Sequence, residues 1–175
     1  MPTLISGSTG VNKITDGTIV NADINSSAAI AGSKLVMPTG SVLQVVSGTS
    51  TANTSTASTS YVATDLSATI TPTSTSSKIY IMVTGFMQVN PSQIHGYITM
   101  YRDSTDLGGN QGFGNWYSDS GGYSEYFCSA SHLDSPSSTS AITYKVYVKS
   151  GSSSGTAGFG NPGRKHTMTL MEIAG

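Results

Sequence analysis

Large apolar residues recur every five or six positions in the N-terminal part of the chain, at Ile14, Ile19, Ile24, Ile30 and Leu35. Small and polar residues fill the intervals, so the spacing matches neither the period of an amphipathic helix nor that of a strand. Ordering the backbone of one residue costs about 1–2 kcal/mol, whereas burying one isoleucine returns only about 1.5–3 kcal/mol. We therefore expect another surface to order this segment, most simply copies of the segment itself.

A different pattern follows the break at Pro38-Thr39-Gly40, where short apolar runs alternate with stretches of Gly, Ser and Thr. Runs bounded by turn residues are typical of strands. The expected strands are 41–46, 61–70, 78–89, 96–102, 123–132, 141–149 and 165–173. Residues 47–60 hold no large apolar side chain, and we interpret them as a loop with a short threonine-rich edge strand. The only helical element that we expect is a short piece within residues 28–35.

Two of these runs differ in the number of apolar faces. Run 141–149 (AITYKVYVK) alternates, so that one face is apolar and the other carries threonine, lysine and tyrosine. Run 78–89 (KIYIMVTGFMQV) is apolar on both faces. A strand of that kind is covered on both sides. We expect the core on one side and a second surface, such as a neighbouring subunit, on the other, with Met82 pointing toward it.

The strand count and the short intervals between turn signals predict an all-β fold. Seven or eight strands in the C-terminal part favour an antiparallel sandwich of jelly-roll type. The break near Pro38 divides the chain into residues 1–39, an extended intertwined segment, and residues 40–175, the sandwich.

Composition narrows the classes of partner. Only 10% of residues are charged and the net charge is −1, so no basic face is available for nucleic acid. No run approaches the roughly 20 apolar residues of a membrane helix, and the N-terminus lacks the features of a signal peptide. We expect a soluble protein made in a cytoplasm. We expect the single cysteine, Cys128, to be a small buried residue that forms no intrachain disulfide.

Two parts of the chain resemble bacteriophage virion appendage proteins of the tail-fibre and head-fibre type. The sequence ITDGTIVNADI at 14–24, continued by IAGSKL at 30–35, is similar to the stalk repeats of phage fibres. The sequence YVATDLSATITPTSTSSKI at 61–79 resembles the opening of a C-terminal β-domain on marine and cyanophage fibre proteins. That family also tends to finish in a strand with Glu-Ile near the terminus, as Glu172-Ile173 does here.

The resemblance implies a homotrimer with a thin stalk and an outward-facing β knob. In that arrangement Ile14, Ile19, Ile24, Ile30 and Leu35 form the trimer stalk, and residues 1–39 attach the protein to other virion proteins. A stalk of about 22 residues reaches at most about 70 Å. The implied protein is therefore a small fibre or tail tip in the virion.

The knob contains one unusual stretch, the glycine-rich residues 108–122. It brings Asn115, Trp116, Tyr117 and Asp119 close together in sequence. An aromatic ring beside amide and carboxylate groups suits a sugar, because the ring covers the apolar face and the polar groups bind hydroxyls. The alternative is that Trp116 and Phe113 fold back and plug the sandwich.

Other chemistry-bearing residues form no recognisable motif. His95, His132 and His166 are scattered, and no nucleophile elbow or phosphate loop is present. We therefore expect no enzyme activity, metal or cofactor. Lys145 and Lys149 flank Tyr147 and form either a basic aromatic binding face or a solvated edge that discourages aggregation.

These observations predict a structural virion protein whose knob recognises a host-surface glycan. A capsid decoration protein that stabilises the head is one alternative. A free carbohydrate-binding module is another, and it would be a monomer.

Overall fold

The computed structural model describes residue 27 and residues 35–90, 93–119 and 122–175. The chain divides into two compact units, Met1–Val36 and Met37–Gly175. Leu35 is 52% exposed. Ile14, Ile19, Ile24 and Ile30, and most of the possible helical piece at 28–35, lie outside the described residues.

The second unit, called the knob below, is built from strands. The described residues form no helix and eleven strands: β1 (Val42–Ser50), β2 (Thr54–Thr56), β3 (Val62–Ile70), β4 (Lys78–Asn90), β5 (Ile94–Arg102), β6 (Thr105–Asp106), β7 (Gly114–Ser118), β8 (Ser124–Asp134), β9 (Ile142–Ser150), β10 (Thr156–Phe159) and β11 (His166–Ile173). The all-β prediction is confirmed.

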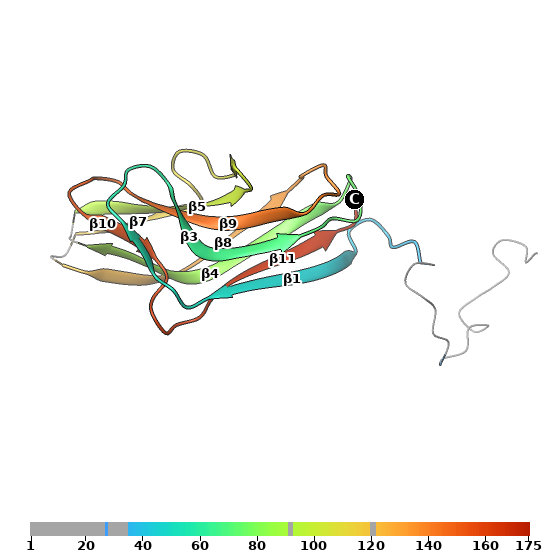
Figure 1. Cartoon of the computed structure of the whole chain (residues 1–175), viewed down its shortest axis with the longest axis horizontal. Helices are drawn as coiled ribbons and strands as arrows, with labels where there is room; N and C mark the ends of the chain where they lie inside the picture. Colours follow the sequence, from blue (N-terminus) through green and yellow to red (C-terminus); the bar gives the residue numbers. More distant parts are fainter. Residues whose placement is uncertain (1–26, 28–34, 91–92, 120–121) are drawn as a thin grey trace, which may run out of the picture. The chain divides into compact units, whose positions relative to one another are not determined.

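Two antiparallel sheets form the layers of a sandwich (Figure 1). Sheet A has β1, β11, β4 and β8 side by side, and sheet B has β3, β9, β5 and β7. Among these eight strands in chain order, sheet A therefore holds the first, eighth, third and sixth, and sheet B the second, seventh, fourth and fifth. This interleaving is the strand order of a jelly roll. The short strands β2, β6 and β10 extend the two sheets.

The core lies between the sheets and follows the two-residue period of the strands. Ile79, Ile81 and Val83 of β4 are fully buried, and Tyr144 and Val146 of β9 in sheet B belong to the same core cluster. The alternation predicted for 141–149 is confirmed. The second apolar face predicted for β4 is also present, because Tyr80, Met82 and Phe86 alternate with the core residues and remain partly exposed.

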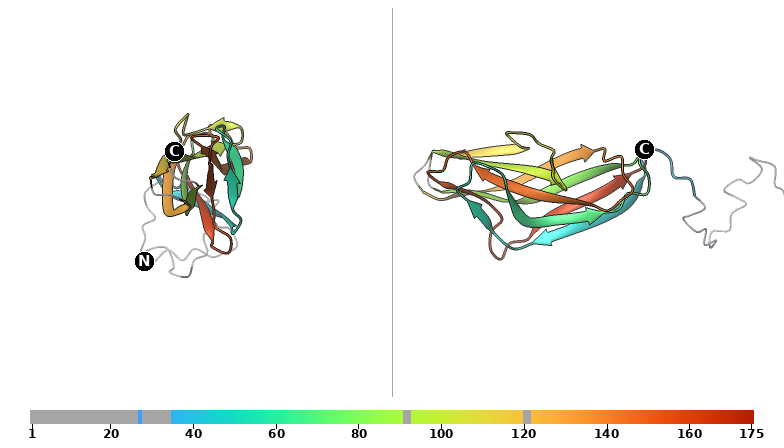
Figure 2. Two further views of the ribbon diagram at one scale, coloured as in Figure 1. Left: turned by 90° about the vertical axis from the view of Figure 1, so that its left-hand side faces the viewer. Right: turned by 45° about the horizontal axis from the view of Figure 1, so that its top comes forward.

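The two ends of the sandwich differ. At one end, called the root end, the chain enters β1 and leaves β11. The N–H of Gly40 donates to the carbonyl of Ala174 at 2.7 Å, and the N–H of Ala174 donates to that of Ser41 at 2.8 Å. The opposite, distal end is where β4 passes to β5 and β7 to β8; it faces the viewer in the left view of Figure 2.

A buried carboxylate holds the root end together. Glu172 is fully buried and accepts hydrogen bonds from Gln44 Nε2 at 2.6 Å and from the N–H and Oγ1 of Thr73 at 2.7 Å each. It thereby joins β1, β11 and the β3–β4 loop. Burial disfavours the charged form, but these hydrogen bonds outweigh it and hold the pKa of Glu172 below its usual value.

Sequence and structure differ mainly in the short strands. Within 47–60, β1 continues to Ser50, and Thr54–Thr56 forms the expected threonine-rich edge strand against β10. The strands β6, β7 and β10 are not among those predicted from the sequence. Glycines interrupt the apolar pattern of β7 and β10, which pair with the longer strands β5 and β4.

Candidate functional site

The tryptophan predicted to contact a sugar points into the sandwich. Trp116 is half-buried and packs against the core, as does Phe113. Its ring lies over Gly96 of β5, where a Cβ atom would come within 2.5 Å of the indole. For these two side chains the structure therefore has the plug arrangement.

The other three predicted residues lie elsewhere. Asn115 and Tyr117 alternate with Trp116 along β7, so they are on the outer face of sheet B. Tyr117 is 45% exposed, with its ring 4.8 Å from that of His95. Asp119 is exposed beyond the end of β7. The structure does not bring the four side chains together on one face.

A different cluster forms on the outer face of sheet B, and the glycine-rich loop helps to build it. Gly112 has a positive φ of 67°, and a Cβ there would collide with the carbonyl oxygen of Ile98 at 1.9 Å and approach the Tyr61 hydroxyl at 2.7 Å. Only glycine allows this close approach. Asn110, two residues before this glycine, lies within hydrogen-bond distance of Lys149 in β9.

Lys149 of β9 is the centre of this cluster. Its Nζ donates to the main-chain oxygen of Asn110 at 2.5 Å and to Asn110 Oδ1 at 3.1 Å. The same ammonium lies 4.6 Å from the ring centroid of Tyr61 and 5.2 Å from that of Tyr97. Two rings and two oxygens thus fix a cation at the surface.

Two shallow hollows adjoin the lysine. One has a volume of about 170 Å³ and the other about 290 Å³. Both are lined by Thr59, Asn110 and Lys149; Tyr97 and Gln111 complete the smaller hollow, whereas Tyr61 and Asp106 belong to the larger one. We call this pair of hollows the Lys149 hollow.

Tyrosines support one wall of the larger hollow. The ring of Tyr61 meets that of Tyr101 edge-on at 6.4 Å, and Tyr101 stacks on Tyr147 at 4.0 Å. Burial, reinforced by the nearby Asp106, raises the pKa of Tyr61 to about 12. Its hydroxyl is protonated at neutral pH and donates to the main-chain oxygen of Asn110 at 3.4 Å.

The outer face of sheet A has a different character near the root end. Strand register places Val45, Met171, Tyr80 and Leu133 in one row across β1, β11, β4 and β8. Val45 is 56% exposed and Leu133 49%. Beside the row lie the exposed Val42 and half-buried Ile173 and Met82. We call Val45, Met171, Tyr80 and Leu133 the apolar row.

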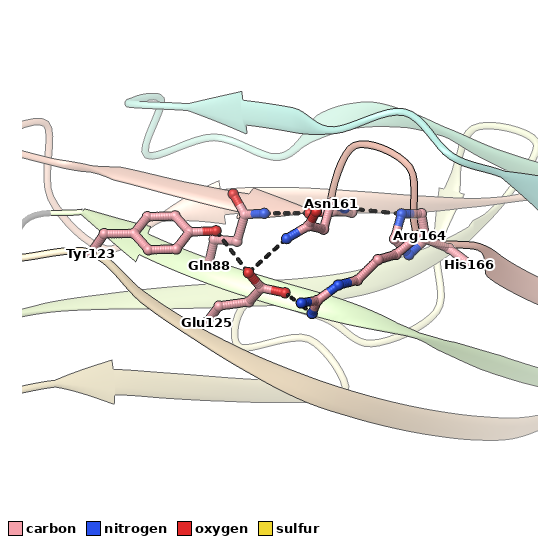
Figure 3. Close-up of polar contacts among 7 residues, drawn as sticks. Gln88, Tyr123, Glu125, Asn161, Arg164 and His166 are labelled. Carbon is pink, nitrogen blue, oxygen red and sulfur yellow. Dashed lines mark hydrogen bonds and ion pairs between the residues drawn. The ribbon is translucent and has the colours of Figure 1, made fainter.

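Farther along sheet A, a polar network fixes the β10–β11 turn (Figure 3). The carboxylate of Glu125 accepts hydrogen bonds from the Tyr123 hydroxyl at 3.0 Å, Asn161 Nδ2 at 2.7 Å and Arg164 Nη1 at 2.8 Å. His166 Nε2 accepts the N–H of Asn161 at 2.9 Å. Burial lowers the pKa of His166, so the ring is neutral. Apart from His166 Nδ1, which is buried without a hydrogen-bond partner, the polar groups of this network bond to one another, and we assign it a structural role.

A second polar network crosses the sandwich. Asp134 of β8 accepts from Arg102 Nη1 at 2.9 Å and from the Tyr144 hydroxyl at 2.7 Å, which ties sheet A to sheet B. Within the residues that the structure describes, no group of histidine, cysteine or carboxylate side chains has the arrangement of a metal site. Cys128 is half-buried, and burial raises its pKa to about 12.

The comparisons with known proteins leave the family open. No protein-family model matches the chain, and a search of curated proteins finds no significant match. The described part of the chain also contains no helix with the length and hydropathy needed to cross a bilayer. The functional conclusion therefore depends on the repeat in the sequence and on the two surfaces of the knob.

Proposed function

We propose that this protein is a small structural appendage of a bacteriophage virion, assembled as a homotrimer through residues 1–39. The same segment attaches it to other virion proteins, and the knob recognises a glycan on the host surface. The observation that carries the proposal is the isoleucine repeat from Ile14 to Leu35, whose large side chains a single extended chain cannot bury. The resemblance to phage fibre repeats supports the same conclusion.

The apolar row supports self-association of the knob. Exposed aliphatic side chains gain free energy only by burial, at about 25 cal/mol per Å². The row lies in the half of sheet A nearest Ser41, where the chain enters the knob. If the N-terminal segments of several copies join, the root ends are held close together, and this surface is the one that a second copy covers.

Substitutions in the repeat test the proposal. We predict that full-length protein is a trimer by light scattering, and that Ile19→Ser combined with Ile24→Ser converts it to a monomer because two buried layers are lost. Thr18→Ser combined with Asn21→Ser is the matched control and should leave the trimer intact. A monomeric wild-type protein at micromolar concentration would overturn the proposal, as would a double isoleucine variant that remains trimeric.

A capsid decoration protein remains the second candidate because the stalk is short, reaching about 70 Å at most. The two candidates differ in what the knob contacts. Binding of purified trimer to host cells favours the appendage, whereas binding to capsids alone favours decoration.

A further inference from the structure

We propose that the Lys149 hollow binds a saccharide that carries a carboxylate or sulfate group, with Lys149 as the anion contact. This inference rests on the proposed recognition function. It places the sugar site at Lys149 instead of at the loop that contains Trp116, and it specifies an acidic saccharide as the ligand.

The charge of Lys149 is the first argument. The ion pairs among the described residues are Arg102 with Asp134 and Arg164 with Glu125, and neither involves Lys149. An ammonium group has three donors. Asn110 accepts two hydrogen bonds from Lys149, and the third donor remains for a ligand.

Preorganisation is the second argument. A free lysine loses much of its rotamer entropy when it is fixed. Here Asn110 and the rings of Tyr61 and Tyr97 already hold the side chain. An anion that binds to this ammonium therefore avoids much of the ordering cost.

The lining of the hollows selects a sugar among anionic ligands. Thr59, Asn110 and Gln111 offer hydroxyl and amide groups that both donate and accept, as sugar hydroxyls require. Tyr97 adds an aromatic edge to the smaller hollow. The hollows have volumes of about 170 and 290 Å³, below the roughly 300–1,000 Å³ of pockets for drug-sized ligands. Each therefore suits a single sugar ring of an oligosaccharide.

The position of Asp106 gives the ligand a direction and excludes a polyanion. Its carboxylate lines the larger hollow, where it accepts from Thr99 Oγ1 at 2.6 Å. No carboxylate lines the smaller hollow. The acidic group of a ligand is therefore favoured on the side of Gln111 and Tyr97. A nucleic-acid backbone, which needs several cations, is disfavoured.

The site also remains open in the proposed assembly. Lys149 of β9 lies opposite Tyr97 of β5 in the strand register, toward the distal end of sheet B. The apolar row lies toward the root end of sheet A. Contacts between copies at the root end leave this hollow in solvent.

Calorimetry with full-length protein tests the proposal. The probes are oligosaccharides of equal length that carry one uronic acid, one sulfate group or no charge. We expect binding of acidic probes, with at least tenfold weaker binding of neutral ones. Lys149→Met should weaken binding of the best acidic probe about tenfold or more, the loss expected for one charge-assisted hydrogen bond. Lys145→Met removes the same charge from the same face of β9 and should change the affinity less than twofold.

Three results would overturn the proposal: no binding of any acidic probe, equal binding of neutral probes, or equal losses in the two lysine variants. Thermal unfolding of each variant verifies that the knob is folded. Asn110→Ala is a second variant, expected to weaken binding about threefold to tenfold because it removes the side-chain oxygen that helps to hold the lysine, whereas the main-chain oxygen remains. If wild-type protein is trimeric and binds host cells but none of the probes, only the Lys149 inference fails. If it is monomeric, the proposed function fails independently.

Discussion

The outer faces of the two sheets obey the same strand alternation, yet they present different chemistry. Near the root end, sheet A exposes aliphatic side chains in one row, including Val45 and Leu133. Toward the distal end, sheet B exposes tyrosines around a fixed lysine. The first surface contributes free energy only when another protein surface covers it. The second is compatible with solvent and can exchange its water for a polar ligand. Under the proposed function, the outer face of sheet A is the assembly face and the outer face of sheet B is the recognition face.

The largest expected effect concerns the assembly face. We predict that Leu133→Asp, alone or with Met82→Asp, weakens association of the trimer at least a hundredfold, because an unpaired charge would be buried between copies at a cost of several kcal/mol. Both side chains are on the outer face, and Leu133 is 49% exposed in the single chain. Analytical ultracentrifugation measures the change.

Its control is Thr69→Asp, which places the same charge at an exposed position in the root half of sheet B. This variant should remain trimeric. If Leu133→Asp and Met82→Asp also remain trimeric, sheet A is not the assembly face, and the contrast between the two sheets loses its functional meaning.

A smaller effect tests the two faces of β7. Trp116→Ala should lower the free energy of unfolding by about 2 kcal/mol, because it opens a cavity against the core. Tyr117→Ala, on the exposed face of the same strand, should change it by less than about 0.5 kcal/mol. Urea denaturation measures both. Equal losses would contradict the inward direction of Trp116.

The smallest effect concerns the two buried titratable groups of β11. His166 and Glu172 both have a lowered pKa in the folded knob, so the unfolded chain binds protons more readily. Stability is then lost as the pH falls, first below the usual pKa of 6.5 for His166 and later below 4.5 for Glu172. Thermal unfolding between pH 8 and pH 3 measures these steps.

Single variants separate the steps. His166→Gln should flatten the decline that begins below about pH 6.5, and Glu172→Gln should flatten the decline that begins below about pH 4.5. Glu172→Gln also leaves fewer acceptors for Gln44 and Thr73 at the root end. An unchanged acid profile in both variants would show that other groups control acid stability.

Much of the sandwich was predictable because its strands carry a local pattern. The run at 141–149 alternates strictly and forms β9, and the apolar run at 78–89 forms β4. The short strands were not predictable, since β7 is held by pairing with β5 rather than by its own glycine-containing sequence. The direction of Trp116 depends on that pairing, so the sequence left both of its interpretations open.

The candidate site was even less predictable. The sequence indicated a basic aromatic face from Lys145, Tyr147 and Lys149, but the residues that shape the hollow are distant in the chain. Asn110 is 39 residues from Lys149 in the sequence. Tyr61 immediately precedes β3, the strand that pairs with β9. A sequence separation of this length carries no pattern from which the two hydrogen bonds between Lys149 and Asn110 could be predicted.

The sequence by itself determined the all-β class of the knob and supplied the N-terminal repeat from which we propose a partner surface, because periodicity and burial free energy are local properties of the chain. Only the tertiary structure decided which side chains share a face. Strand pairing and sheet stacking join segments far apart in sequence, and they turned Trp116 inward, aligned the apolar row and placed Lys149 between Tyr61 and Tyr97.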